Sequence, residues 1–153
     1  MKKYVITEVT KEYYSRTLYQ IKAICSFGNV EEGELGGYIE KEENLHHEGF
    51  AWVYGDAWVY GDAGVSSRKH IAWFSSVGSE NGTVTAYTIK TGEIEVTRGC
   101  FRGTIDQFEN KVKSRHGGNR YEEEYLVLVQ FIRVRFREIT VEIIKDEADA
   151  VRA

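Results

Sequence analysis

The chain of 153 residues contains no proline and only two cysteines, and none of its apolar runs approaches the length of a membrane-spanning helix. Without proline, every turn has to come from Gly, Asn, Asp and Ser. A transmembrane helix needs about 20 mostly apolar residues, so we expect no membrane partner. Cys25 and Cys100 lie far apart in the sequence, and we expect both to be free thiols.

Several other signals are missing. The start, Met-Lys-Lys-Tyr-Val-Ile-Thr-Glu, lacks the apolar core of a secretory signal, which predicts a cytoplasmic protein. The net charge of −4 does not favour binding to bulk nucleic acid. A Walker-type phosphate loop is absent, which argues against an NTPase. His46 and His47 are adjacent and would point to opposite faces of a strand, so we expect neither a metal nor a cofactor.

What the sequence does contain is an exact tandem repeat. Residues 51–56 read Ala-Trp-Val-Tyr-Gly-Asp, and residues 57–62 read the same six again. A six-residue period is typical of a hexapeptide β-helix. Gly-Asp would supply each turn, because glycine tolerates positive φ and aspartate bonds its own local backbone. Two inward columns follow from the spacing: Val53, Val59 and Val65, and Ala51, Ala57 and Ala63.

The alternation Trp-Val-Tyr places valine inside and both aromatic side chains outside. The sequence therefore predicts an exposed aromatic ladder that forms an interface: Trp52, Tyr54, Trp58 and Tyr60. The alternative is a pair of hairpin strands that share a sequence. Because repeat stacks need several units, so short a β-helix must be capped by its flanks or completed by another subunit, and we expect a homo-oligomer.

The flanking segments indicate sheets and helices. Residues 4–10 and 18–25 predict a hairpin, and residues 71–98 a small antiparallel sheet. Thr104 and Gln107 form a capping box that starts a helix, which Gly117 ends. Residues 119–138 have helical spacing, although a β-strand remains open for 126–144. The expected fold is α+β and mostly β, with an N-terminal hairpin, a short left-handed β-helix and a C-terminal sheet with one or two helices, divided at 1–70 and 71–153.

One loop offers an anion site. The turn from Arg98 to Thr104 precedes a helix whose free N–H groups point outward, and its arginines can donate hydrogen bonds. Two aromatic residues further back could stack a base. The predicted ligand-binding residues are Trp73, Ser79, Tyr87, Arg98, Arg102, Thr104 and His116. The alternative is that Thr104 only caps the helix and that both arginines are solvated.

Enzymatic functions are weaker hypotheses, and we predict no catalytic residue. A left-handed β-helix could indicate an acyltransferase with a histidine base, but one coil is too short for the groove that this chemistry needs. Cys100 precedes a helix N-terminus, where the macrodipole lowers a thiol pKa, and His116 could act as its base. No Asn or Asp stands out to orient that histidine.

Two runs also carry a resemblance. Gly-Gly-Tyr-Ile-Glu followed by Glu-Asn-Leu and Gly-Phe-Ala-Trp-Val-Tyr-Gly-Asp-Ala, and later Gly-Cys-Phe-x-Gly-Thr, resemble a group of phage and enterobacterial proteins with a short hexapeptide-repeat β-helix, over roughly residues 25–135. The phage setting, with the anion site, implies a protein that sequesters a nucleotide-like signal of bacterial immunity as counter-defence. The alternative is a module that blocks or scaffolds a host protein through its aromatic ladder.

Overall fold

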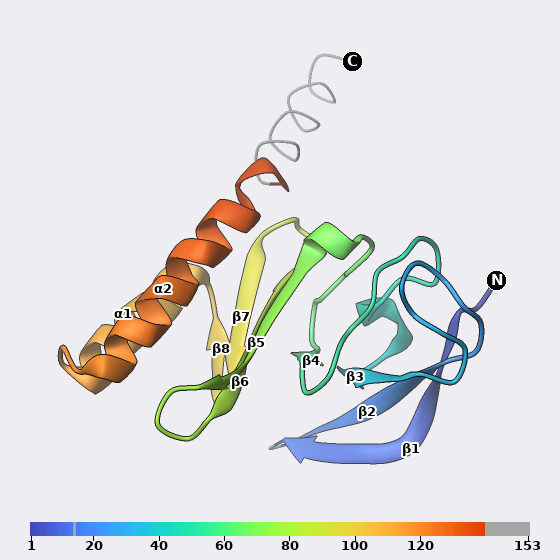
Figure 1. The fold of residues 1–153 in the computed structure, drawn as a ribbon, viewed down its shortest axis with the longest axis horizontal. Helices are drawn as coiled ribbons and strands as arrows, with labels where there is room; N and C mark the ends of the chain where they lie inside the picture. Colours follow the sequence, from blue (N-terminus) through green and yellow to red (C-terminus); the bar gives the residue numbers. More distant parts are fainter. Residues whose placement is uncertain (14, 140–153) are drawn as a thin grey trace.

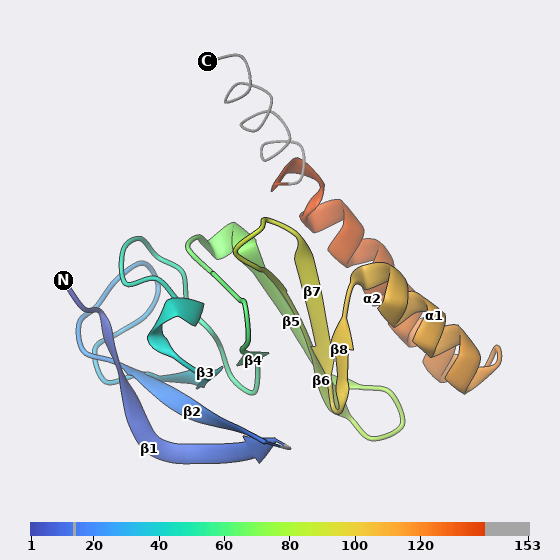
Figure 2. The same ribbon diagram turned by 180° about the vertical axis from the view of Figure 1, so that it is seen from behind.

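In a computed structural model, described here for residues 1–13 and 15–139, the chain forms two four-stranded sheets and two α-helices (Figure 1). The strands follow in order β1-β2-β3-β4 in the first sheet and β5-β6-β7-β8 in the second. The two sheets lie on either side of the repeat, and both helices cover the far face of the second sheet (Figures 1 and 2). The fold class is therefore α+β.

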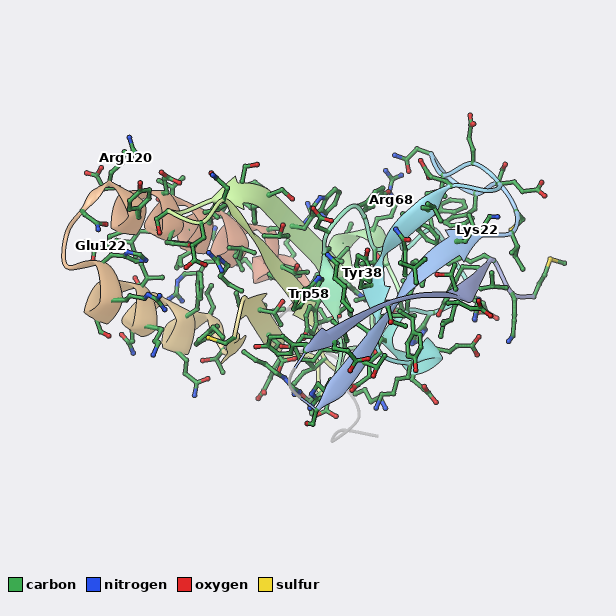
Figure 3. The ribbon with its side chains drawn as sticks, turned by 90° about the horizontal axis from the view of Figure 1, so that it is seen from below. Lys22, Tyr38, Trp58, Arg68, Arg120 and Glu122 are labelled. Atoms are coloured by element: carbon green, nitrogen blue, oxygen red, sulfur yellow. The ribbon has the colours of Figure 1, made fainter. Side chains whose placement is uncertain are left out.

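The first sheet begins with the expected hairpin. Strands β1 (Tyr4–Tyr13) and β2 (Arg16–Ala23) pair antiparallel, so both reach further toward their turn than the sequence predicts. Strand β3 (Leu35–Ile39) continues the sheet antiparallel to β2, and β4 (Trp58–Val59) pairs parallel to β3. Tyr38 lies opposite Trp58 in that pair (Figure 3).

The repeat does not build a β-helix, and no solenoid is present in residues 1–13 and 15–139, which corrects the predicted fold. Only Trp58–Val59 of the two hexads is a strand, and the other residues run as one irregular loop between the sheets. The flanks enclose that loop, because Ile71 and Tyr87 of the second sheet share its core with the first sheet. The repeat is therefore covered by its own flanks and needs no second subunit for that purpose.

The periodicity was nevertheless informative about side chains and turns. Both Tyr-Gly-Asp-Ala segments close with a backbone hydrogen bond, and Gly55 and Gly61 have φ of +49° and +65°. Both Gly-Asp turns are thus confirmed. All members of the two predicted inward columns are fully buried: Ala51, Val53, Ala57, Val59, Ala63 and Val65.

The exposed aromatic ladder is wrong. Trp52 and Tyr60 are each only 1% exposed. Trp52 packs edge-on against Tyr4 and Phe27, with ring centroids 6.3 Å and 5.4 Å away. The inside–outside alternation of a β-strand does not apply to these residues, because most residues of the two hexads are not in a strand.

Tyr54 and Trp58 are half-buried rather than exposed. Tyr54 stacks on Trp73 of the second sheet, with centroids 4.4 Å apart, while Trp58 meets the ring of Tyr13 at 5.3 Å. The four aromatic residues thus fasten the repeat to the two sheets and leave no continuous aromatic face.

The second sheet is antiparallel throughout, with strands β5 (Ile71–Val77), β6 (Gly82–Thr88), β7 (Ile94–Arg98) and β8 (Phe101–Gly103). Helix α1 (Ile105–His116) starts at the expected capping box of Thr104 and Gln107 and ends at Gly117 in the left-handed conformation. Helix α2 (Arg120–Arg135) confirms the helix predicted for residues 119–138 as far as Arg135. The β reading of 140–144 falls outside the described residues. Two short 3-10 helices, η1 (Glu42–Asn44) and η2 (Arg68–His70), complete the described part of the chain.

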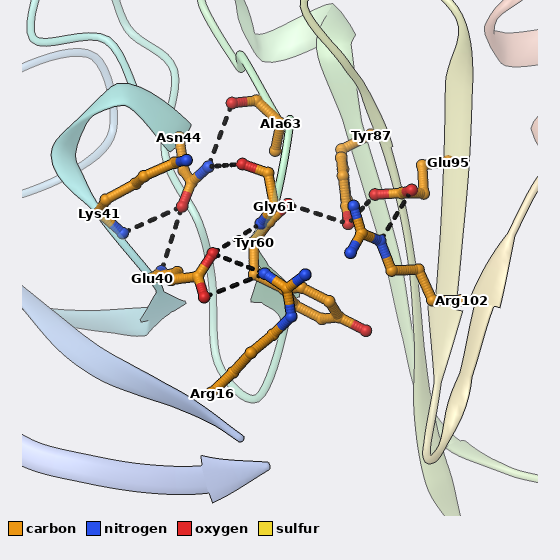
Figure 4. Close-up of polar contacts among 10 residues, drawn as sticks. All are labelled: Arg16, Glu40, Lys41, Asn44, Tyr60, Gly61, Ala63, Tyr87, Glu95 and Arg102. Atoms are coloured by element: carbon orange, nitrogen blue, oxygen red, sulfur yellow. Dashed lines mark hydrogen bonds and ion pairs between the residues drawn. The ribbon is translucent and has the colours of Figure 1, made fainter. Parts of the chain in front are cut away.

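A buried asparagine holds the second hexad to the first sheet. The side chain of Asn44 donates to the carbonyl oxygens of Gly61 and Ala63 and accepts from the N–H groups of Glu40 and Lys41, at 3.0–3.2 Å (Figure 4). All its hydrogen-bonding capacity toward the backbone is used, which explains how a fully buried amide is tolerated.

Candidate anion-binding pocket

A pocket of about 490 Å³ lies between the β7–β8 hairpin, the β5–β6 turn and the two helices. Strand β7 ends at Arg98, and the turn residues Gly99 and Cys100 reverse the chain into β8, with Gly99 at φ +53°. Helix α1 then runs back along this hairpin and forms a second wall. The lining consists of Ser79, Glu80, Arg98, Gly99, Cys100, Phe101, Arg102, Phe108, Lys111, Val112, Arg115, His116 and Tyr125.

The wall formed by α1 results from helical spacing. Lys111 and Arg115 are four residues apart, so they lie on one face, next to the buried Phe108 and Val112. The apolar pair packs into the core of the second sheet, and the two long cationic side chains stay exposed at the rim. This places exposed positive charge above an apolar floor.

The pocket is cationic although the chain as a whole is acidic. Arg98, Arg102, Lys111 and Arg115 line it, against the single carboxylate of Glu80. The whole chain carries a net charge of −4. Positive charge concentrated in a concave wall of an acidic protein attracts anionic ligands locally, because low-dielectric walls focus the field.

Arg98 is the best-positioned of these groups. Its Nε donates to the hydroxyl of Tyr125 at 3.1 Å, and its terminal nitrogen lies 3.6 Å from a Glu80 carboxylate oxygen. The Arg98 side chain is 18% exposed, whereas that of Glu80 is 70% exposed. An anion could therefore displace the solvated Glu80 while the guanidinium keeps its orientation from Tyr125.

An aromatic group completes the floor. His116 stacks on Tyr125 with ring centroids 5.6 Å apart, and Phe108 meets Tyr125 edge-on at 5.7 Å. Phe101 contributes a further ring, 5.3 Å from Phe108. Such a floor can hold the planar part of a ligand while the cationic wall holds its negative charge.

The structure brings together four of the seven predicted ligand residues: Ser79, Arg98, Arg102 and His116 all line this pocket. The loop that follows Arg98 and the C-terminal end of α1 converge because α1 runs back past the β7–β8 hairpin that precedes it. The site thus lies beside the last turns of α1, whereas the sequence argument placed it at the first turn.

Thr104, Trp73 and Tyr87 do not belong to the pocket. The Thr104 hydroxyl accepts from the Gln107 N–H, and the Thr104 N–H donates to the Gln107 side chain, so Thr104 acts as the cap that the alternative described. Trp73 already stacks on Tyr54. Tyr87 is fully buried, so neither aromatic residue is placed to stack a ligand base in this pocket.

Tyr87 and Arg102 instead share an internal polar network (Figure 4). The Tyr87 hydroxyl donates to Glu95 at 2.6 Å, and Arg102 Nε donates to the same carboxylate at 2.9 Å. Burial, and then the charge of Glu95, raise the pKa of Tyr87. The guanidinium of Arg102 also lies 5.2 Å from the ring centre of Tyr60. Because Arg102 is already paired, we regard it as a structural border of the pocket.

Lys111, Arg115 and Tyr125 were not predicted. The spacing of Lys111 and Arg115 beside Phe108 and Val112 was available in the sequence as a signal. Tyr125 could not be found this way, because only the packing of α2 brings it to Arg98. Cys100 also lines the pocket and is exposed, while Cys25 is half-buried, and both are free thiols.

Within residues 1–13 and 15–139, no group of three or more His, Cys, Asp or Glu side chains is arranged to hold a metal ion. Over the same residues, no helix combines the length and apolar character needed to cross a membrane. Comparisons with protein-family models, curated proteins and solved structures gave no match. The resemblance to phage proteins therefore stays a prediction.

Proposed function

We propose that this protein is a non-enzymatic binder that sequesters a small anionic, nucleotide-like ligand in the pocket beneath Arg98. The observation that carries the proposal is the convergence of Arg98, Lys111 and Arg115 on an aromatic floor in a chain of net negative charge. Arginine suits this task because its fork matches phosphate oxygens with two hydrogen bonds.

The dimensions support a ligand of this class. Pockets for small molecules measure about 300–1,000 Å³ and are mostly apolar with a few placed polar groups. The volume of about 490 Å³ falls within that range. His116 and Tyr125 would contact the base, and the rim cations Lys111 and Arg115 would contact phosphate together with Arg98.

The biological setting rests on the resemblance to phage proteins. In an infected bacterial cytoplasm, a binder present in excess over a nucleotide signal of immunity would lower the free signal without turnover. The second function weighed above, capture of a host factor by an aromatic ladder, loses its basis because Trp52 and Tyr60 are buried.

Native mass spectrometry tests the proposal without a guess about the ligand. The protein is purified gently from bacterial cytosol and sprayed from volatile buffer, beside the double variant Lys111→Met/Arg115→Met. We expect an additional mass of nucleotide size on the native chain and its loss from the variant. If the native chain and the variant carried the same additional mass, the assigned pocket would be contradicted. A native chain with no additional mass would count against the proposal that it retains a ligand.

A further inference from the structure

Helix α2 has two apolar faces, and within residues 1–13 and 15–139 only one of them is buried. Its inner face packs on the second sheet and α1 through Tyr125, Val129 and Ile132, which are at most 5% exposed. The outer face carries Val127, Phe131 and Val134, which are 65%, 48% and 54% exposed. Helices that are apolar on opposite sides are normally covered on both. Helix α2 lies beside α1 in the outer layer that covers the second sheet (Figure 1).

The outer residues have the spacing of a helix–helix seam. Val127, Phe131 and Val134 follow the pattern i, i+4, i+7, which corresponds to alternate d and a positions of a heptad. The stripe lies toward β5, because the ring of Phe131 meets Phe74 edge-on at 5.4 Å. Arg133, on the side of the helix facing α1, instead pairs with Asp106 and Glu109. A second helix on the stripe would therefore leave the pocket beside α1 open.

The charges on α2 are separated along its length. Glu122, Glu123 and Glu124 follow Arg120 in its first turns, while Arg133 and Arg135 stand in its last turn, with Arg137 just beyond. Within the chain, Arg133 is held by Asp106 and Glu109, and Arg135 donates to the carbonyl oxygens of Ile71 and Arg68, which leaves the exposed Arg137 for a partner. Two copies side by side in parallel would bring acid to acid and base to base. Two copies in antiparallel orientation bring the acidic end of each to the basic end of the other, and also oppose their helix dipoles favourably.

From this self-complementarity we propose that α2 pairs with α2 of a second copy of the chain, antiparallel about a twofold axis between Val127 and Phe131. In this register, Val127 of each copy packs on Phe131 of the other. Glu123, which flanks the seam, comes next to Arg137 of the opposite copy, twice by symmetry. Both residues are exposed, as an isologous interface requires.

This interface differs from one made by the repeat, whose aromatic residues are occupied within the chain. It is also independent of the proposed ligand. A loss of ligand binding with the dimer intact, or the reverse, would separate the two proposals.

The test is the mass of the full chain in solution, measured by light scattering and by sedimentation over a range of concentrations. We expect twice the chain mass for the native protein and the single-chain mass for Val127→Glu, a change at a side chain that is 65% exposed in the single chain. Phe131→Glu should behave in the same way. Val9→Glu serves as the matched control, because Val9 is a 53% exposed valine on β1, and this variant should stay dimeric.

Charge exchange tests the antiparallel register. Glu123→Arg alone should weaken dimerisation, and Glu123→Arg together with Arg137→Glu should restore it. A native chain that stays monomeric at the highest attainable concentration would overturn the proposal. So would a dimer that survives Val127→Glu with the fold intact by circular dichroism, or a double exchange that restores nothing.

Discussion

Arg98 Nε lies 3.1 Å from the hydroxyl oxygen of Tyr125, and this hydrogen bond joins the end of β7 to the inner face of α2 across the pocket. The two residues are 27 positions apart in sequence. The bond orients the arginine from behind and leaves its terminal nitrogens toward Glu80 and the pocket.

The rim cations should govern affinity without affecting the fold. Lys111→Met or Arg115→Met removes one exposed charge, and we expect each to raise the Kd of the retained ligand about tenfold, or about 1.4 kcal/mol. The salt dependence of binding should fall in parallel, because fewer ionic contacts remain. Arg68→Met, an exposed arginine of η2 outside the pocket, is the control. Equal losses in all three variants would contradict the assignment of the pocket.

Cys100 offers a direct reporter of occupancy. It is exposed and lines the pocket, whereas Cys25 lies elsewhere and is half-buried. A bound ligand should slow alkylation of Cys100 and leave the rate at Cys25 unchanged, as followed by mass spectrometry of the peptides. Protection of both thiols, or of neither, at saturating ligand would argue against a ligand in this pocket. Because no catalytic role is assigned to the thiol, Cys100→Ser should keep full affinity.

The buried amide of Asn44 should be a main determinant of stability. Asn44→Ala leaves the carbonyl oxygens of Gly61 and Ala63 and two backbone N–H groups without their partner. Unsatisfied buried groups cost about 1–3 kcal/mol each, so we expect a loss of at least about 3 kcal/mol in the free energy of unfolding by urea. Asn110→Ala, at an exposed position of α1, should change it by less than about 0.5 kcal/mol.

Two glycines test how closely the repeat approaches β3. A Cβ added at Gly36 would lie 2.6 Å from the carbonyl oxygen of Val53 and 2.7 Å from Ile21 Cγ1. Gly36→Ala should therefore lower the midpoint of thermal unfolding by an amount equivalent to about 1–3 kcal/mol. Gly64→Ala is the matched change, since its Cβ would meet nothing nearer than 3.6 Å. A similar loss in both variants would show that the lack of space at Gly36 is not the cause.

His47 should make stability depend on mild acid. Its Nδ1 accepts the backbone N–H of Lys3 at 3.2 Å, and burial lowers the pKa of His47 below its ordinary 6.5, against the opposing charge of Glu42. The unfolded chain therefore takes up the proton first as the pH falls. The stability contributed by neutral His47 is complete above pH 6.5 and is lost as the pH falls through the lower folded pKa.

Urea unfolding from about pH 7 to about pH 5 should thus show a decline that His47→Gln removes in part. The adjacent His46 is exposed, and His46→Gln should retain the decline. If both variants follow the native curve, another group is responsible for the acid sensitivity.

The sequence predicted local features better than the way they assemble. Gly55 and Gly61 could be assigned to turns because glycine before aspartate has few other roles at a six-residue period. The valine column could be assigned to the interior because its members recur at every sixth position and alternate with the aromatic residues. A period alone does not reveal what packs outside it, and Tyr4 and Phe27 cover Trp52 from distant segments.

In the pocket, too, single residues could be predicted from the sequence but their assembly could not. Arg98 and His116 could be proposed from their places beside a glycine turn and a helix end. Their convergence depends on the direction in which α1 docks, and β8 was missed because three residues carry too little strand pattern. Tyr125 reaches the pocket only through tertiary packing, which no spacing within α2 specifies.

The most direct measurement is a calorimetric titration of the native chain and of Arg98→Met with cyclic dinucleotides, cyclic trinucleotides and ADP-ribose derivatives. Circular dichroism would first establish that the variant is folded. We predict that at least one of these probes binds the native chain saturably and that Arg98→Met weakens its binding at least about tenfold. Absence of binding by every probe, or equal affinity for both proteins, would contradict the account.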